Sequence, residues 1–208
     1  MKFKEALKEL REKTKKRNFD QTLDLILNLK SFDIKKDAVG IVVSLPNTYK
    51  KVKVCAFLES SIKSDVLERV ISKNEIDKFD LKEMKKMSKE MDFFIANAKL
   101  MPLVAKKFGK VLGAIGKMPD PKIGGVVSQE STEAIQNAVN KLKNIVKTRT
   151  KEKSIKLAVG KESKTDEELI QNLERVFKDI VEKLPKKELN VKNVMLKFTM
   201  GPAIQVKK

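Results

Sequence analysis

The chain has 208 residues, with 46 lysines and arginines against 28 acids, a formal net charge of +18, no histidine and one cysteine, Cys55. Without histidine there is no histidine general base, no Ser-His-Asp triad and no imidazole metal ligand. A single cysteine forms neither an internal disulfide nor a zinc cage.

The positive charge favours a large polyanion as partner, because each lysine or arginine placed on a phosphate releases condensed counterions. A well-solvated surface rich in lysine and glutamate is the alternative, but it would leave the charges balanced. A membrane surface or an acidic protein ranks behind nucleic acid. No apolar run approaches the ~20 residues that span a bilayer. The first residues lack the apolar region of a signal peptide, so we expect a soluble, intracellular protein.

The first third of the chain predicts a helix followed by strands. Phe3, Ala6, Leu7 and Leu10 recur at helical spacing and indicate an amphipathic helix that ends at the basic run 13–17. Alternating or short apolar patterns then predict three strands, at 21–30, 39–45 and 51–57.

The middle of the chain predicts alternating helices and strands. Helices are expected at 62–71, 80–90 and 100–108, and a short, very apolar strand at 92–96 is typical of a buried parallel sheet. Residues 109–125 hold five of the eight glycines and two of the six prolines, so this segment is predicted to be irregular.

The last third of the chain contains the most regular pattern. Thr165 and Glu168 form a capping box ahead of a full apolar helical stripe that runs from Leu169 to Leu184. The other expected elements are a helix with an apolar face over 134–145 and strands at 155–159, 191–197 and 203–206.

Strand and helix alternate only in the middle, which argues for a parallel α/β unit there. About 50 residues at the start and about 60 at the end are each too small for a stable core, but together they would make one α+β domain. We therefore predict a discontinuous α+β domain of residues 1–49 and 149–208, with a Rossmann-like parallel α/β domain, 50–148, inserted into it.

The glycine-rich segment does not match a nucleotide-binding motif. A Walker loop ending at Gly116-Lys117 would require glycine at 111 and Ser or Thr at 118, where the chain has Val111 and Met118. The glycine spacings do not give G-x-G-x-x-G either. Cys55 lies in a lysine-flanked strand and is interpreted as a structural thiol. Nothing in the sequence asks for an enzyme, a cofactor or a metal.

Two segments are harder to explain as scaffold than the motifs above. Residues 17–22 run from a basic helix end into a strand with Phe19 between polar residues, which suits stacking on a base or sugar, although Phe19 could equally lie in the core. Residues 198–202 combine Thr, Met and Gly between two strands, which allows a close backbone approach to a ligand. An ordinary hairpin connection is the alternative there.

These segments occur in the same order in a known family. The chain resembles the ribosomal protein L-one family over essentially its whole length, through residues 17–22, 112–121, 159–161 and 199–202. Residues 92–96 and 100–103 resemble the archaeal branch in particular. The resemblance implies the split two-domain fold described above.

The resemblance also implies a function and a site. Family members are constituents of the large ribosomal subunit that bind rRNA of the mobile side stalk, contact exit-site tRNA and assist its release. Many also repress translation by binding their own mRNA. The resemblance further implies a protein of the cytoplasmic ribosome that does not bind a membrane and is a monomer when it is not bound to the ribosome. The rRNA-binding residues carried over by position are Arg17, Asn18, Phe19, Thr22, Lys161, Asn193, Thr199, Met200 and Gly201. The tRNA-side loop carried over is Gly116, Lys117, Met118 and Pro119.

The chain departs from the family pattern at two places. Ala114 and Ile115 stand where the family usually has Pro and Arg, which weakens the carry-over of function to that loop. Asn193 stands where bacterial members often have Ser, and Asn can still donate and accept hydrogen bonds. Two other interpretations stay open: a free-standing translational regulator or general RNA-binding module, and an enzyme that uses the α/β insert on a phosphorylated substrate.

Overall fold

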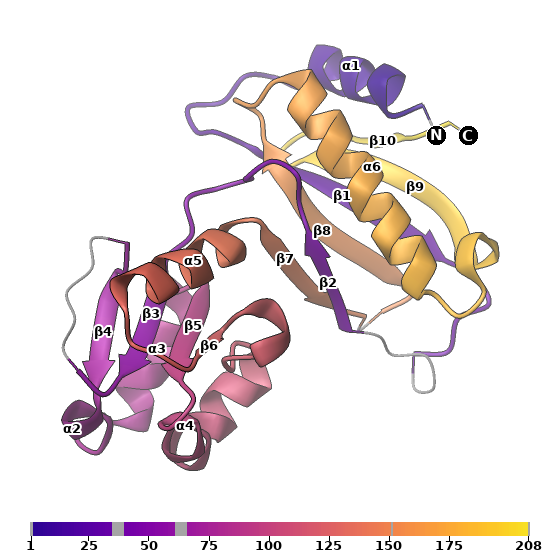
Figure 1. Cartoon of the computed structure of the whole chain (residues 1–208). Helices are drawn as coiled ribbons and strands as arrows, with labels where there is room; N and C mark the ends of the chain where they lie inside the picture. The colour runs from indigo at the N-terminus through magenta and orange to yellow at the C-terminus, as the bar shows by residue number, and fades with distance from the viewer. Residues whose placement is uncertain (1, 35–39, 61–65, 151, 208) are drawn as a thin grey trace. The chain divides into compact units, whose positions relative to one another are not determined.

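The structure is a computed structural model that describes residues 2–34, 40–60, 66–150 and 152–207 (Figure 1). The chain divides into two compact units, unit 1 of residues 1–50 and 144–208, and unit 2 of residues 51–143. The mixed α/β fold class predicted from the sequence is confirmed, with an antiparallel sheet in unit 1 and a parallel sheet in unit 2.

Unit 1 is built from both ends of the chain. Its elements are α1 (Phe3–Lys13), β1 (Thr22–Leu29), β2 (Gly40–Ser44), β7 (Ile145–Arg149), β8 (Ser154–Lys161), α6 (Asp166–Lys183), η2 (Lys187–Asn190), β9 (Val191–Phe198) and β10 (Ala203–Gln205). Four strands form an antiparallel sheet in the order β10-β9-β1-β8, and β2 pairs with β7 in a separate antiparallel ribbon.

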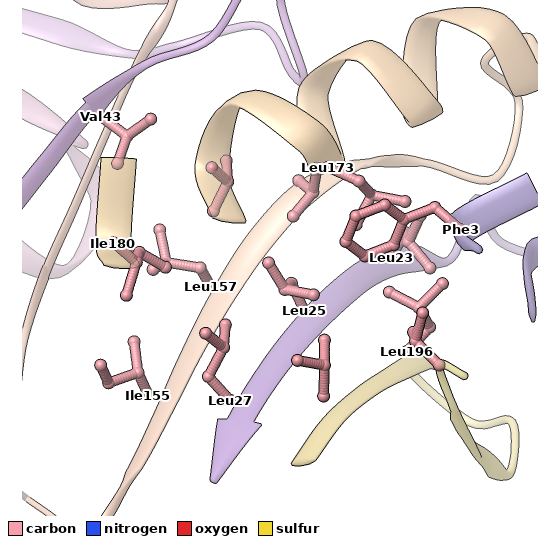
Figure 2. Packing of buried hydrophobic residues seen from close by; sticks show 14 of the residues in the cluster. Phe3, Leu23, Leu25, Leu27, Val43, Ile155, Leu157, Leu173, Ile180 and Leu196 are labelled. Carbon is pink, nitrogen blue, oxygen red and sulfur yellow. The ribbon is translucent and has the colours of Figure 1, made fainter. Parts of the chain in front are cut away.

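The core of unit 1 lies between the four-stranded sheet and helices α1 and α6. Alternate residues of β1, namely Leu23, Leu25, Leu27 and Leu29, are buried, as their period of two predicts. Figure 2 shows Leu23, Leu25 and Leu27 in one cluster with Ile155 and Leu157 of β8 and with Leu173 and Ile180 of α6. The capping box is confirmed: Thr165 Oγ1 accepts from Glu168 N at 3.4 Å, and Glu168 Oε2 accepts from Thr165 N at 3.3 Å.

Unit 2 is an α/β layer structure. Its elements are β3 (Val54–Leu58), β4 (Arg69–Ser72), α2 (Lys73–Ile76), α3 (Leu81–Glu90), β5 (Phe93–Asn97), α4 (Met101–Ile115), η1 (Pro121–Ile123), β6 (Val126–Val127) and α5 (Thr132–Lys143). The parallel sheet has the order β4-β3-β5-β6. Phe57, Phe94 and Phe108 stack between this sheet and α4, with ring centroids 5.9 and 6.0 Å apart.

Four predicted elements of the middle region are wrong in part. The helix expected at 62–71 is not present over 66–71: residues 69–72 form β4, whose pairing with β3 overrides the helical spacing, and residues 61–65 lie outside the described residues. β3 begins at Val54 and all five of its residues are buried, as is typical of an inner strand in a parallel sheet that helices cover.

The other two differences concern where helices end. Helix α4 continues through Gly109 and Gly113 to Ile115, although the sequence predicted irregular chain from 109. Gly116 then ends the helix in the left-handed conformation, with φ of 75°. Ile145 belongs to β7 and not to the preceding helix. Since β7 pairs with β2, residues 144–148 group with unit 1, and the second crossing falls five residues earlier than 149.

Candidate nucleic-acid interface

Three segments meet at one end of the antiparallel sheet. Thr22, the first residue of β1, pairs with Lys161 at the end of β8, and Leu23 pairs with Phe198 at the end of β9. The segment before β1 and the β9–β10 connection are thereby brought together, although about 180 residues separate them along the chain. We call the surface formed by Phe19, Thr22, Lys161, Thr199 and Met200 the strand-end surface.

Thr199 is fixed to the start of β1. Its hydroxyl oxygen accepts from Thr22 N at 3.0 Å and lies 3.4 Å from Thr22 O, and its own N donates to Thr22 O at 3.1 Å. These bonds extend the β1–β9 pairing by one residue beyond the strand. The hydroxyl therefore positions the connection in the free protein.

Gln21 is a second positioning residue, and sequence reasoning missed it. Its side chain is fully buried, its Oε1 accepts from Met200 N at 3.1 Å, and its Nε2 donates to Glu162 Oε2 at 3.0 Å. It therefore joins the β9–β10 connection to the end of β8. The alternation of β1 contained the signal, since 21 has the same parity as the buried residues 23, 25, 27 and 29.

Gly201 has an internal reason to be glycine. A Cβ there would lie 2.8 Å from Thr14 Oγ1 and 3.3 Å from Thr14 Cγ2. Thr14 follows α1 and its hydroxyl donates to Leu10 O at 2.6 Å. The glycine thus lets the β9–β10 connection pack against the end of α1.

Phe19 and Met200 present apolar surface at this end of unit 1. Phe19 is 50% exposed and Met200 is 60% exposed, so the core position considered for Phe19 is wrong. Arg17 and Asn18 are also exposed. The backbone N of Met200 donates to Gln21, which lies two residues after Phe19 along the chain.

Lys161 places a positive charge at the same end. Its Nζ donates to Thr22 Oγ1 at 2.9 Å and to Asp20 O at 3.2 Å. The Asp20 carboxylate is engaged with Ser163, from which it accepts at 2.8 and 3.0 Å. Polar groups around the exposed Phe19 are therefore fixed before any ligand arrives.

Asn193 lies on the same face of the sheet but at its other end. It is paired with Asn28, whose Nδ2 donates to Asn193 Oδ1 at 2.7 Å. Thr199 lies six positions further along the chain, which is about 20 Å at ~3.3 Å per residue. The structure therefore does not bring Asn193 together with the strand-end surface.

Asp24 is a partly buried acid on this face. Burial raises the pKa of the Asp24 carboxyl, and the positive charges of Lys197 and Lys161 act in the opposite direction. Lys197 is its partner across the β1–β9 pair.

The loop 116–119 lies in unit 2 and is mostly internal. Lys117 Nζ donates to Ser88 O at 2.8 Å and Met91 O at 2.6 Å, and so neutralises the carbonyl end of α3. Pro119 is buried and Met118 packs against the unit 2 core, which leaves Gly116 as the exposed member of the loop.

Cys55 is a structural thiol, as predicted. It is fully buried, and burial raises its pKa to about 12, with Arg69 acting in the opposite direction. A thiol with that pKa is protonated at neutral pH and does not serve as a nucleophile. Over residues 2–34, 40–60, 66–150 and 152–207, His, Cys, Asp and Glu side chains form no group of three or more that could hold a metal ion.

None of the helices in the described part of the chain has the length and apolar character needed to cross a membrane.

The architecture defines a basic two-unit protein: both chain ends build an antiparallel α+β unit, and a parallel α/β unit is inserted into its sequence. Residues 10–202 match the Ribosomal protein L1p/L10e family, and the chain belongs to this family. It is 37% identical to the large ribosomal subunit protein uL1 of Methanothermobacter thermautotrophicus, over 97% of both chains. It is also 35% identical to the proteins of the same name from Methanocaldococcus jannaschii and Pyrococcus abyssi, over 98% and 99% of this chain and 94% and 95% of theirs.

These relatives confirm the resemblance predicted from the sequence, including its archaeal character. Their names are those of ribosomal proteins and not of enzymes, in agreement with the expectation for this chain.

Proposed function

We propose that the protein is a constituent of the large ribosomal subunit, located with it in the cytoplasm, and that unit 1 binds rRNA through the strand-end surface. Its relatives are named as large-subunit proteins. Unit 1 also has 28 lysines and arginines against 16 acids, a net +12. That charge supplies sequence-independent attraction to phosphate.

The observation that carries the proposal is the exposure of Phe19 and Met200 above an internally bonded frame. A base or sugar can stack on an aromatic ring or a thioether, while hydroxyl and ammonium groups take 2′-hydroxyls and phosphates. Thr22, Thr199 and Lys161 supply such groups at fixed positions. Because their geometry is held by β1 and β8, little order has to be gained on binding.

The test is the affinity of the full chain for an rRNA fragment of the side stalk. Phe19→Ala and Met200→Ala should each weaken binding by about 1–3 kcal/mol if each side chain stacks on a base. Leu189→Ala is the matched control, since Leu189 is an apolar residue of unit 1 that is 74% exposed and lies in η2. Equal effects at all three positions would contradict the proposed site.

Co-sedimentation separates the ribosomal role from that of a free-standing regulator. The ribosomal proposal expects the protein to sediment with large subunits through moderate salt, whereas a regulator that acts on its own remains in the supernatant.

We also propose the two finer roles that the family resemblance implies. In the first, the loop 116–119, of which Gly116 is the exposed member, contacts exit-site tRNA and assists its release. Large subunits depleted of the protein should release deacylated tRNA more slowly, and the full chain should restore the rate while unit 1 alone should not.

In the second role, the strand-end surface binds the protein's own mRNA and represses translation. Stalk rRNA and the mRNA leader should then compete for one site, and Met200→Ala should weaken both. Simultaneous binding of the two RNAs would exclude this role.

A further inference from the structure

Helices α3 and α4 of unit 2 share one core cluster and turn a common lysine face outward. Met84 and Met87 of α3 are buried together with Val104, Phe108 and Leu112 of α4. The helices therefore cover the same side of the parallel sheet. Helix α5 contributes no residue to this cluster.

The outward residues are lysines at regular helical spacing. On α3 they recur at i, i+3, i+4 and i+7, opposite the buried methionines, and on α4 they recur at i and i+4. We call the set the lysine face: Lys82, Lys85, Lys86, Lys89, Lys106 and Lys110. All six are exposed.

The ammonium groups of these lysines lack internal partners, in contrast to several cations of unit 1. In the part of the chain that the structure describes, none of the six ammonium groups makes a hydrogen bond or an ion pair. In unit 1, i,i+4 ion pairs join Lys13 to Glu9 at 2.7 Å and Arg175 to Asp179 at 3.2 Å. The lysine face is therefore not a surface of balanced, paired charges.

The two helices also hold most of the charge of unit 2. They contain seven lysines and two glutamates, a net +5, and unit 2 as a whole has 18 cations and 12 acids, a net +6. Helix α4 has three lysines and no acid.

Gly109 and Gly113 make the α4 part of this face smooth. A Cβ at either position would meet no atom within 4 Å, so internal packing does not require glycine there. Glycine inside a helix lowers stability relative to alanine. Beside Lys106 and Lys110, the missing side chains leave room for a backbone to approach the helix.

We propose that the lysine face binds the phosphate backbone of a structured RNA, as an RNA contact independent of the strand-end surface and of the loop 116–119. Lysine acts as a point charge suited to phosphate without base readout. Protein interfaces instead enrich Trp, Tyr and Arg, and the exposed residues of α3 and α4 include none of these. The positive charge fits either polyanion, and the side-chain composition of the face favours RNA over an acidic protein.

The experiment compares two double variants of the full chain that remove the same charge. The test variant is Lys106→Gln/Lys110→Gln. The control is Lys51→Gln/Lys141→Gln, which removes two exposed lysines of unit 2 outside α3 and α4. The probe is a 20-base-pair RNA duplex without stalk sequence, and Kd is measured over a series of KCl concentrations. Because unit 1 is unchanged in both variants, its contribution cancels.

The test variant should weaken duplex binding at least fivefold, and the slope of log K against log salt should become shallower by about 1.4–1.8, as for two lost phosphate contacts. The control should change Kd less than twofold. An unchanged circular dichroism spectrum confirms the fold of each variant.

Equal losses in both doubles would show that only net charge matters and would overturn the proposal. Polyglutamate serves as a second probe, in place of an acidic protein. If the test variant loses affinity for polyglutamate but binds the duplex as the parent does, the proposal is overturned in favour of an acidic protein partner.

Discussion

Asp24 is an acid placed where the chain otherwise presents basic and neutral groups. Its pKa is raised because burial disfavours the carboxylate more than Lys197 and Lys161 favour it. The ionised form therefore costs stability in the folded state at neutral pH. It also places negative charge on the sheet face that leads to the strand-end surface.

We predict that Asp24→Asn raises the free energy of unfolding at pH 7 by roughly 0.5 kcal/mol, the scale of a partly exposed substitution. The folded pKa is raised, so the penalty is complete above it and vanishes as the pH falls below the unfolded value of 3.8. Urea denaturation at pH 7 and pH 3 measures this. An advantage of the variant that persists at pH 3 would show that packing, not charge, is responsible.

Glu130 occupies the place where open α/β sheets ordinarily bind ligands, beyond the carboxyl ends of the strands where their order reverses. Its Oε1 accepts from Glu59 N at 2.5 Å and Asn97 Nδ2 at 2.6 Å, and its Oε2 accepts from the N and Oγ of Ser60 at 3.0 and 2.5 Å. The donors that would hold a phosphate are thus satisfied by the chain's own carboxylate. This agrees with the failure of the nucleotide motifs in the sequence.

We predict that Glu130→Gln destabilises the protein by about 1.5–3 kcal/mol at pH 7. The NH₂ group of the new amide would replace one accepting carboxylate oxygen, so it would face donor groups and accept none of their hydrogen bonds. Burial raises the pKa of Glu130, but the hydrogen bonds from Ser60, Glu59 and Asn97 together lower it by more, so the net pKa is lowered. The stabilisation is therefore present above the unfolded pKa of 4.5 and is lost as the pH falls through the folded pKa.

Guanidinium denaturation at pH 7 and at pH 3 checks the Glu130 prediction. Glu133→Gln, in the first turn of α5, is the matched control and should change little. A constant difference between Glu130→Gln and the parent at both pH values would argue against the charged bonds as the cause.

At the scale of elements, α4 is a helix whose stability is lowered by its own glycines. Gly109→Ala and Gly113→Ala should each raise the free energy of unfolding by about 0.5–1 kcal/mol, since both added methyl groups meet open space. Gly125→Ala is the contrasting change, because its Cβ would lie 3.0 Å from Asp120 N, and it should destabilise. Chemical denaturation of the three variants tests this, and destabilisation at 109 or 113 would contradict it.

The elements that the sequence predicted well are those whose core contacts repeat along one face. Helices α1 and α6 each bury one continuous apolar stripe, and strand β1 buries every second residue. Periodicity alone therefore identifies these three elements. Strand β3 is buried along its whole length, so it shows no alternation of polar and apolar residues. Strand β4 is short and is held by its pairing with β3, which lies elsewhere in the sequence. In α4 the glycines looked like loop residues, but packing of Val104, Phe108 and Leu112 overrides their low helix propensity.

The candidate site was predictable to a similar extent. Side chains that the sequence marked as unusual, such as Phe19 and Met200, are exposed at one end of the sheet. The internal bonds of Gln21 and Lys117 depend on chain segments that meet only in the fold, so their positioning roles could not be read from local pattern.

At the scale of the whole molecule, each unit has its own core. Among the described residues, the cluster of unit 1 draws none from 51–143, and that of unit 2 draws none from outside this range. Both ends of unit 2 are joined to unit 1, so folded unit 1 restricts the unfolded insert. Closing a loop of 93 residues costs about 4 kcal/mol by the logarithmic rule, which raises the stability of unit 2 while unit 1 is folded.

Cys55, the single cysteine, reports on the opening of unit 2 alone. Because the thiol is fully buried in β3, a thiol reagent reaches it only when unit 2 opens. Opening of unit 2 with unit 1 still folded costs less than global unfolding, so this route should dominate labelling. RNA at 100 times Kd stabilises the unit that binds it by about 2.7 kcal/mol. If stalk RNA binds unit 1, it should raise the thermal stability of unit 1 and change Cys55 labelling less than twofold, whereas labelling through global unfolding would slow by roughly 100-fold. A 100-fold slowing of labelling by stalk RNA would show that the units unfold together. The RNA duplex, in contrast, should slow Cys55 labelling if it occupies the lysine face of unit 2.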